Sequence, residues 1–142
     1  MSTELHLALV RTFHAQKNRT RPGMVEIGLT PGQPKILRYL SRHDCCMQKE
    51  IAEALDIEPA TVSQVLNNMA KAGLVQKAAP AERRRAESVS ITEKGRAGFE
   101  KWLRLCHRID EISLDGFSPE ERRQFTEYLC RMYRNLTGKA LE

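Results

Sequence analysis

The side chains with the clearest capacity for chemistry lie on one short stretch, Glu58 to Gly73, whose apolar residues recur every three or four positions. This spacing predicts a helix with Val62, Val65, Leu66 and Met69 on its buried face. The opposite face carries hydroxyl, amide and ammonium groups, at Thr61, Ser63, Gln64, Asn67, Asn68 and Lys71. Helices that present such groups bind base edges and phosphates in the major groove of DNA. A solvated helix surface is the simpler explanation, but such surfaces are usually rich in Glu, and no acid lies between Pro59 and Gly73.

Three consecutive arginines, Arg83, Arg84 and Arg85, form a second group suited to an anionic partner. They follow Pro80 between two segments of alternating polarity, Leu74–Lys77 and Ser88–Ile91, which predict the strands of a hairpin. At a hairpin tip beyond a recognition helix, arginines are suited to phosphate or minor-groove contact. Lys77 supplies another phosphate-binding cation. A flexible charged loop is the alternative interpretation.

The residues before the polar helix predict a helix-turn-helix. Apolar residues mark a short helix over Lys49–Leu55, and Asp56-Ile57 forms a tight turn. Pro59 fits the first turn of the second helix, and Gly73 fits the position just past its end. The two helices and the hairpin together predict a winged helix-turn-helix that binds duplex DNA.

Further helices are predicted on both sides of this core. The first runs from about Glu4 to Gln16, with Leu5, Leu9 and Phe13 on one face, and a polar loop from Lys17 to Gly28 follows it. A second helix opens at Thr30-Pro31-Gly32-Gln33, where Thr30 is a good N-cap and Gln33 can complete a capping box.

Two helices complete the chain after the hairpin. One begins at Thr92-Glu93-Lys94, and the last begins with a capping box at Ser118-Pro119-Glu120-Glu121. The last helix has an apolar face of Phe125, Tyr128, Leu129, Met132 and Leu136. The predicted fold is mainly α with a small β-hairpin wing (α+β). We expect a single domain over residues 1–142, with the winged helix-turn-helix over residues 30–92.

Composition excludes several functional classes. The 142 residues carry a net charge of +5, which favours an anionic partner only modestly. No apolar run approaches the roughly 20 residues of a membrane span, and the N-terminus lacks the features of a signal peptide. The sequence has no Gly-rich phosphate loop, nucleophile elbow or recognisable acid–base pair. We therefore expect a cytoplasmic protein that is not an enzyme and needs no cofactor.

The cysteines and histidines raise two further possibilities. Cys45 and Cys46 are candidates for oxidant sensing, and their alternative role is that of small apolar fillers in the connector from Ser41 to Cys46. Cys106 lies on an apolar stripe and is expected in the core. Pairing His43 with Cys45 or Cys46, or Cys106 with His107, does not give the ligand spacing of a metal site. We therefore expect no metal.

With these elements in place, the chain closely resembles the MarR family of bacterial transcriptional regulators over nearly its whole length. The motifs that carry the resemblance keep the family's order and spacing, and they are Leu29–Gln33, Glu50–Leu55, Thr61–Ser63, Gly73–Val75, Ile91–Gly95 and Gly116–Arg122. The resemblance implies a homodimer with two winged-helix lobes in successive major grooves of a pseudo-palindrome. Residues 1–20 and 93–142 would then form the helical dimerisation region, through Leu5, Leu9, Phe13, Phe125, Leu129, Met132 and Leu136.

Two positions depart from the family pattern. Arg83 stands where the family wing usually has the Asp that orients the arginine at the position of Arg85. Cys46-Met47 stands where the family places a Ser or Thr N-cap, and neither residue caps well. Gln48 and Lys49 are the expected phosphate contacts at that helix start.

The predicted function is that of a sequence-specific DNA-binding regulator that responds to a small-molecule effector. The resemblance implies a repressor, because repressors are more common than activators in this family. Two alternatives stay open. The trigger is cysteine oxidation in one of them, and in the other the winged helix docks a protein instead of DNA.

Overall fold

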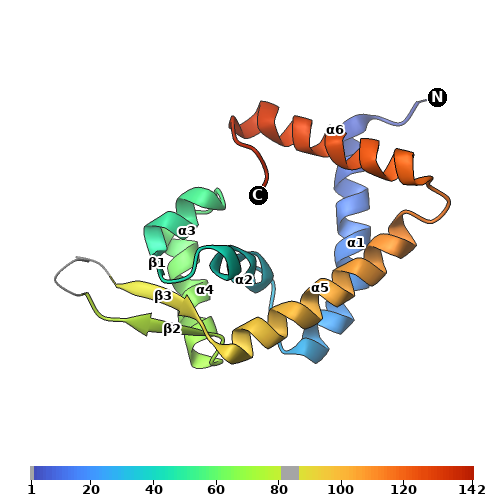
Figure 1. Cartoon of the computed structure of the whole chain (residues 1–142). Coiled ribbons are helices and arrows are strands. Elements are labelled where there is room, and N and C mark those ends of the chain that lie inside the picture. The colour runs from blue at the N-terminus through green and yellow to red at the C-terminus, as the bar shows by residue number, and fades with distance from the viewer. Residues whose placement is uncertain (1, 81–86) are drawn as a thin grey trace. The chain divides into compact units, whose positions relative to one another are not determined.

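The computed structural model describes residues 2–80 and 87–142. These residues form two compact units, one within residues 1–107 and the other within residues 108–142. In chain order, the first unit begins with α1 (Leu5–Ile27), α2 (Gln33–Arg42), β1 (Cys46–Met47), α3 (Gln48–Ala54), α4 (Pro59–Lys71) and β2 (Val75–Ala78). The strand β3 (Ser88–Ile91) completes the sheet, and α5 (Glu93–Ser113) leads into the second unit, which contains α6 (Pro119–Thr137) (Figure 1).

The sheet is antiparallel with the strand order β1-β3-β2. Lys77 of β2 and Cys46 of β1 both pair with Val89, from opposite sides of β3. The predicted hairpin strands are confirmed. The connector predicted from Ser41 to Cys46 is wrong at its end, because Cys46 and Met47 form β1. A two-residue strand has too little alternation to be recognised, and it exists here because β3 supplies its hydrogen-bonding partner.

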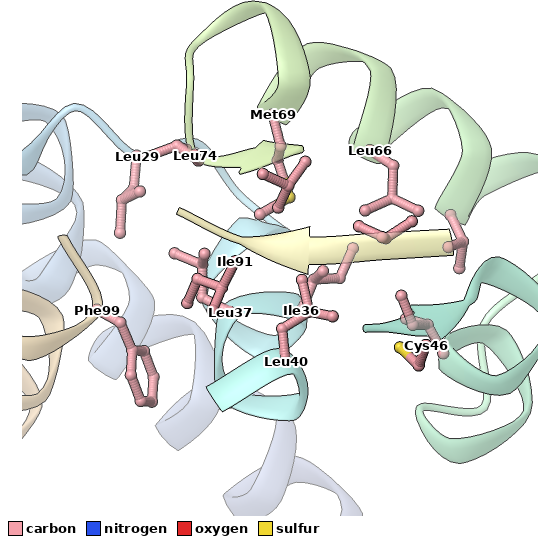
Figure 2. Close-up of a cluster of buried hydrophobic side chains, with 14 of the residues drawn as sticks. Leu29, Ile36, Leu37, Leu40, Cys46, Leu66, Met69, Leu74, Ile91 and Phe99 are labelled. Atoms are coloured by element: carbon pink, nitrogen blue, oxygen red, sulfur yellow. The ribbon is translucent and has the colours of Figure 1, made fainter. Parts of the chain in front are cut away.

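The core of the first unit lies between α2, α3, α4 and the sheet. Ile36, Leu37 and Leu40 of α2 are at most 1% exposed, and Figure 2 shows them beside Leu66 and Met69 of α4. Leu74, Ile91 and Phe99 extend the same cluster toward α5. Burial of each such side chain is worth about 1.5–3 kcal/mol. The core therefore fixes the rotation of α4, on which the polar face depends.

The helix α1 is longer than predicted, and the loop predicted from Lys17 to Gly28 is wrong. The helix continues through Pro22 and ends at Gly28, which has φ +88°. Pro22 removes one backbone donor in a part of the helix where Asn18, four residues earlier, is exposed, so water can bind the carbonyl left without a partner. The backbone at Gly23 approaches α5 so closely that a Cβ there would lie 2.8 Å from Leu105. Pro22-Gly23 therefore belongs to a helix contact and not to a loop.

The predicted start of the last helix is confirmed, with Ser118 as its N-cap. The hydroxyl of Ser118 accepts from the Glu121 amide at 3.1 Å, and the Glu121 carboxylate accepts from the Ser118 amide at 2.8 Å. The helix start predicted at Thr30 is wrong, because α2 begins at Gln33 with Gly32 as its N-cap. The Gln33 carboxamide oxygen still accepts from the Thr30 amide at 3.0 Å, which closes the turn before the helix. Within residues 2–80 and 87–142, no helix combines the length and apolar character needed to cross a membrane.

Candidate nucleic-acid interface

The polar face of α4 is presented outward because the opposite face is locked into the core. Val62, Leu66 and Met69 are fully buried at one-turn intervals. The predicted DNA-binding positions that are exposed on this helix are Thr61, Gln64, Asn67, Asn68 and Lys71, whereas Ser63 is half-buried. The helix thus carries neutral hydrogen-bonding groups along one accessible side, with a cation at its end.

The turn between α3 and α4 sets the angle of the polar face. Asp56 adopts φ +56°, a left-handed conformation that Asp tolerates better than most residues. The next amide, that of Ile57, donates to the Ala52 carbonyl at 3.0 Å and closes the turn. At the start of α3, Lys49 is exposed, while the carboxamide of half-buried Gln48 donates to the Pro59 carbonyl at 3.5 Å. Gln48 therefore links the first residue of α3 to the first residue of α4.

The other end of α4 is held by the start of α5. The ammonium of Lys94 donates to the Ala72 carbonyl at 2.6 Å, and the Thr92 hydroxyl donates to the Gly73 carbonyl at 2.6 Å. Gly95 approaches the chain here so closely that a Cβ would lie 2.2 Å from the Leu74 carbonyl oxygen. These contacts satisfy carbonyls that a helix end leaves without internal partners, and they fix α4 against the base of the wing.

Lys77, which was predicted to contact a phosphate, also contacts two side chains of the protein. Its ammonium donates to the Asn67 carboxamide oxygen on α4 and lies 3.7 Å from the Glu87 carboxylate before β3. Two residues predicted to contact DNA independently are therefore joined to each other. The three wing arginines predicted to bind DNA, Arg83, Arg84 and Arg85, lie outside the described residues.

Asp44 is a residue of this region that the sequence interpretation missed. Its carboxylate accepts from the backbone amides of Cys45 at 3.0 Å and Ile91 at 2.9 Å, and it pairs with Arg96 at 3.2 Å. One side chain thus joins the end of α2 to β3 and α5. The positive φ of Cys45, +57°, brings the chain around this carboxylate. An Asp before two cysteines gives no local signal of such a role.

The adjacent cysteines differ in environment. Cys45 is exposed, and Cys46 is buried at 6% exposure in the core. Burial, followed by the negative charges of Glu50 and Asp44, raises the pKa of the Cys46 thiol to about 11. At neutral pH Cys46 is therefore a neutral thiol, in accord with the apolar role considered for it. Cys106, predicted in the core, is half-buried. No three His, Cys, Asp or Glu side chains gather in a metal-binding arrangement within residues 2–80 and 87–142.

The residues predicted for dimerisation are accessible on the single chain. Leu5 is 69% exposed and Phe13 57% exposed on α1, and on α6 Leu136 is 76% exposed. Leu9, Phe125 and Leu129 are also exposed, and Met132 is half-buried. Apolar side chains in such number on two helices are unusual at a surface that stays in water.

The chain is similar in sequence and in fold to known transcriptional regulators. The model of the MarR family matches residues 27–86, a range that contains α2, β1, α3, α4 and β2. The HTH-type transcriptional repressor MdtR of Bacillus subtilis (strain 168) is 25% identical over 132 residues, which are 93% of this chain and 85% of MdtR. The regulator TtmR of Methylorubrum extorquens (strain PA1) is 26% identical over 99% of this chain and 71% of its own.

Solved structures of similar proteins share the fold. A probable transcriptional regulator from Pseudomonas aeruginosa superimposes with a TM-score of 0.80 at 26% identity, over 91% of this chain and 96% of that chain. The S. aureus MepR–DNA complex superimposes with a TM-score of 0.79 at 22% identity, over 94% of this chain and 97% of that chain. The predicted winged-helix fold is confirmed by these likenesses.

Proposed function

Because the chain belongs to the MarR family of winged helix-turn-helix transcriptional regulators, we propose that it binds a pseudo-palindromic DNA operator as a cytoplasmic homodimer. As a member of this family of regulators it is not an enzyme, as predicted. The observation that carries the proposal is the outward face of α4, where Thr61, Gln64, Asn67 and Asn68 present amides and a hydroxyl on a helix fixed by the core. MepR, a similar protein, has been solved as a complex with DNA.

The two parts of the interface contribute in different ways. Lys71 and the wing arginines would neutralise phosphates and supply most of the affinity, since release of counterions drives binding to duplex DNA. The α4 amides would supply specificity through base edges. Gln48 and Lys49 would fix the register by contacting the backbone near the start of α4.

Regulation would act through the spacing of the two lobes. Half-sites one helical turn apart tolerate little change in the separation of two recognition helices. A small-molecule effector that binds one separation better than the other would therefore shift the equilibrium toward or away from DNA. Repression is the proposed outcome, and MdtR, a similar protein, is a transcriptional repressor.

One experiment separates this function from its alternatives. Bound sequences are selected from random duplex DNA at fixed salt, with and without peroxide. The proposal expects a two-fold symmetric consensus with half-sites about one turn apart. A consensus lost only with peroxide, and retained in Cys45→Ser, would support redox control. If no sequence is enriched and binding to duplex DNA is negligible, the DNA-binding function is wrong, and a protein-docking role becomes the better hypothesis.

A further inference from the structure

The side chain of Lys77 links the wing to the recognition helix. Lys77 and Val75 share one face of β2 because side chains alternate along a strand. Val75 is buried in the core at 3% exposure, so the same face directs Lys77 toward α4, which β2 follows. There the Lys77 ammonium donates to Asn67 Oδ1 and stays 3.7 Å from Glu87 Oε1.

This contact determines which way the Asn67 carboxamide faces. An ammonium has three donors and no acceptor, so only the oxygen of a carboxamide can bond to it. With Oδ1 turned toward Lys77, Nδ2 and its two N–H donors lie on the other side of the group. A charge-assisted hydrogen bond is stronger than a neutral one, so Lys77 opposes rotation of the amide.

The orientation limits what Asn67 can recognise. Asparagine reads adenine by accepting from N6 through Oδ1 while donating to N7 through Nδ2. We propose that Lys77 is a positioning residue that holds Asn67 as a hydrogen-bond donor toward DNA. Asn67 then favours a partner that offers only acceptors, either the N7/O6 edge of guanine or a phosphate oxygen, over adenine, whose bidentate match would need Oδ1 to accept from N6. This inference rests on the proposed binding of α4 to duplex DNA.

The test uses Lys77→Met, which keeps the aliphatic stem and removes the ammonium. Lys71→Met is the matched control, because it removes the same charge from exposed Lys71 on α4. Asn67→Ala identifies the operator position that depends on the carboxamide, and the double variant Asn67→Ala/Lys77→Met measures coupling. Thermal melts confirm that each variant is folded before duplexes are selected at one salt concentration.

Two results support the proposal and separate its two sources of acceptor. If Asn67 contacts a base, the position that Asn67→Ala erases is guanine-rich in the wild type. Lys77→Met then raises its adenine-to-guanine ratio by roughly tenfold, whereas Lys71→Met weakens all sequences equally. If Asn67 contacts a phosphate, no position changes, but the affinity losses of Lys77→Met and Asn67→Ala are not additive.

Two results overturn it. One is an adenine preference in the wild type at the Asn67-dependent position. The other is that Lys77→Met behaves as Lys71→Met does and adds fully to Asn67→Ala.

A measurement on the free protein separates failure of this inference from failure of the proposed function. Relaxation of the Asn67 Nδ2H2 group in ¹⁵N NMR should give a lower order parameter in Lys77→Met than in the wild type, and no change in Lys71→Met. An order parameter that is unaffected by Lys77→Met contradicts the positioning role even if DNA binds. If the wild type binds no duplex DNA, the DNA-binding function and the base preference proposed for Asn67 are both wrong. An Asn67 amide that is restrained in the wild type and mobile in Lys77→Met would still support the contact between Lys77 and Asn67.

Discussion

Asp44 joins three segments that come together only in the folded chain. Its carboxylate accepts from the Ile91 amide just beyond the Cys46–Val89 pair, where the pairing of β1 with β3 ends. A backbone amide left without an acceptor costs about 1–3 kcal/mol. The ion pair with Arg96 is half exposed, so it adds little beyond this hydrogen bond.

At the same scale, the amides of α4 should distinguish operator from random DNA. Gln64→Ala and Asn68→Ala are each expected to cost roughly 1–3 kcal/mol on the selected site, because each would remove a bidentate base contact. On random duplexes the loss should be small. Fluorescence anisotropy at one salt concentration measures both. Equal losses on the two kinds of DNA would mean that these side chains position the backbone and that DNA shape carries the specificity.

The two adjacent thiols should react very differently. At pH 8, iodoacetamide should label exposed Cys45 while Cys46 stays unmodified, since Cys46 is buried and its pKa of about 11 keeps the thiolate scarce. Because the pKa of Cys46 is raised above the usual 9.0, its contribution to stability is complete below pH 9 and is lost as the pH rises through 11. Peptide mass spectrometry reports both sites. If Cys46 is labelled as fast as Cys45 in the folded protein, Cys46 again becomes a candidate for oxidant sensing.

At the scale of elements, signals confined to neighbouring residues could be read from the sequence, and long-range ones could not. The capping box at Ser118 and the burial of Val62, Leu66 and Met69 were predictable because the residues concerned are three or four apart. The extension of α1 was not, since the contact that favours it joins Gly23 to Leu105.

The candidate site divides in the same way. The polar face of α4 follows from its periodicity alone. The link between Lys77 and Asn67 was missed because the two residues come from different elements and meet only when β2 lies beside α4.

The junction of α4, β3 and α5 gives a test of close packing. Gly95→Ala should destabilise the protein by about 1–3 kcal/mol, because its Cβ would lie 2.2 Å from the Leu74 carbonyl oxygen and 2.9 Å from Ile91 Cγ1. Gly98→Ala, three residues on in the same helix, is the control. Its Cβ would meet Leu29 at 3.9 Å, and it should stabilise by about 0.5–1 kcal/mol. Urea unfolding measures both, and equal effects would remove the close approach as the reason for glycine at residue 95.

The wing should contribute through charge. Replacement of Arg83, Arg84 and Arg85 by Ala is expected to weaken binding to all duplexes, with about 0.9 lost from the slope of log K against log salt for each phosphate contact removed. Titrations at several salt concentrations give the slope. A slope equal to that of the wild type would place these arginines away from the DNA.

At the scale of the whole molecule, the exposed apolar side chains of α1 and α6 bear on assembly. Several of them, among them Leu5, Phe13 and Leu129, are at least 39% exposed on the single chain. Covering each Leu or Phe is worth up to about 1.5–3 kcal/mol. A second copy of the chain that covered these faces would make separation of the subunits costly.

Leu129→Glu should therefore yield a monomer or an unfolded chain. Operator binding should fall with assembly, since one lobe would span only half of the proposed pseudo-palindrome. Leu141→Glu is the matched control, because Leu141 is 54% exposed and lies beyond the end of α6 at Thr137. It should leave the oligomeric state unchanged. Sedimentation at micromolar concentration decides the matter. A wild-type monomer that binds its operator tightly would contradict the dimer.

The short strand β1 also bears on how the protein avoids self-association through its sheet. A strand with an open edge is a template on which another chain can add its own strand. On the β1 side of β3, Cys46 and Met47 pair with Val89 and Ser88, and the next amide, that of Ile91, is held by the Asp44 carboxylate. Two residues and one side chain thus close this side of β3 to strand addition, so the base of the wing is protected from edge-to-edge aggregation while α4 stays accessible.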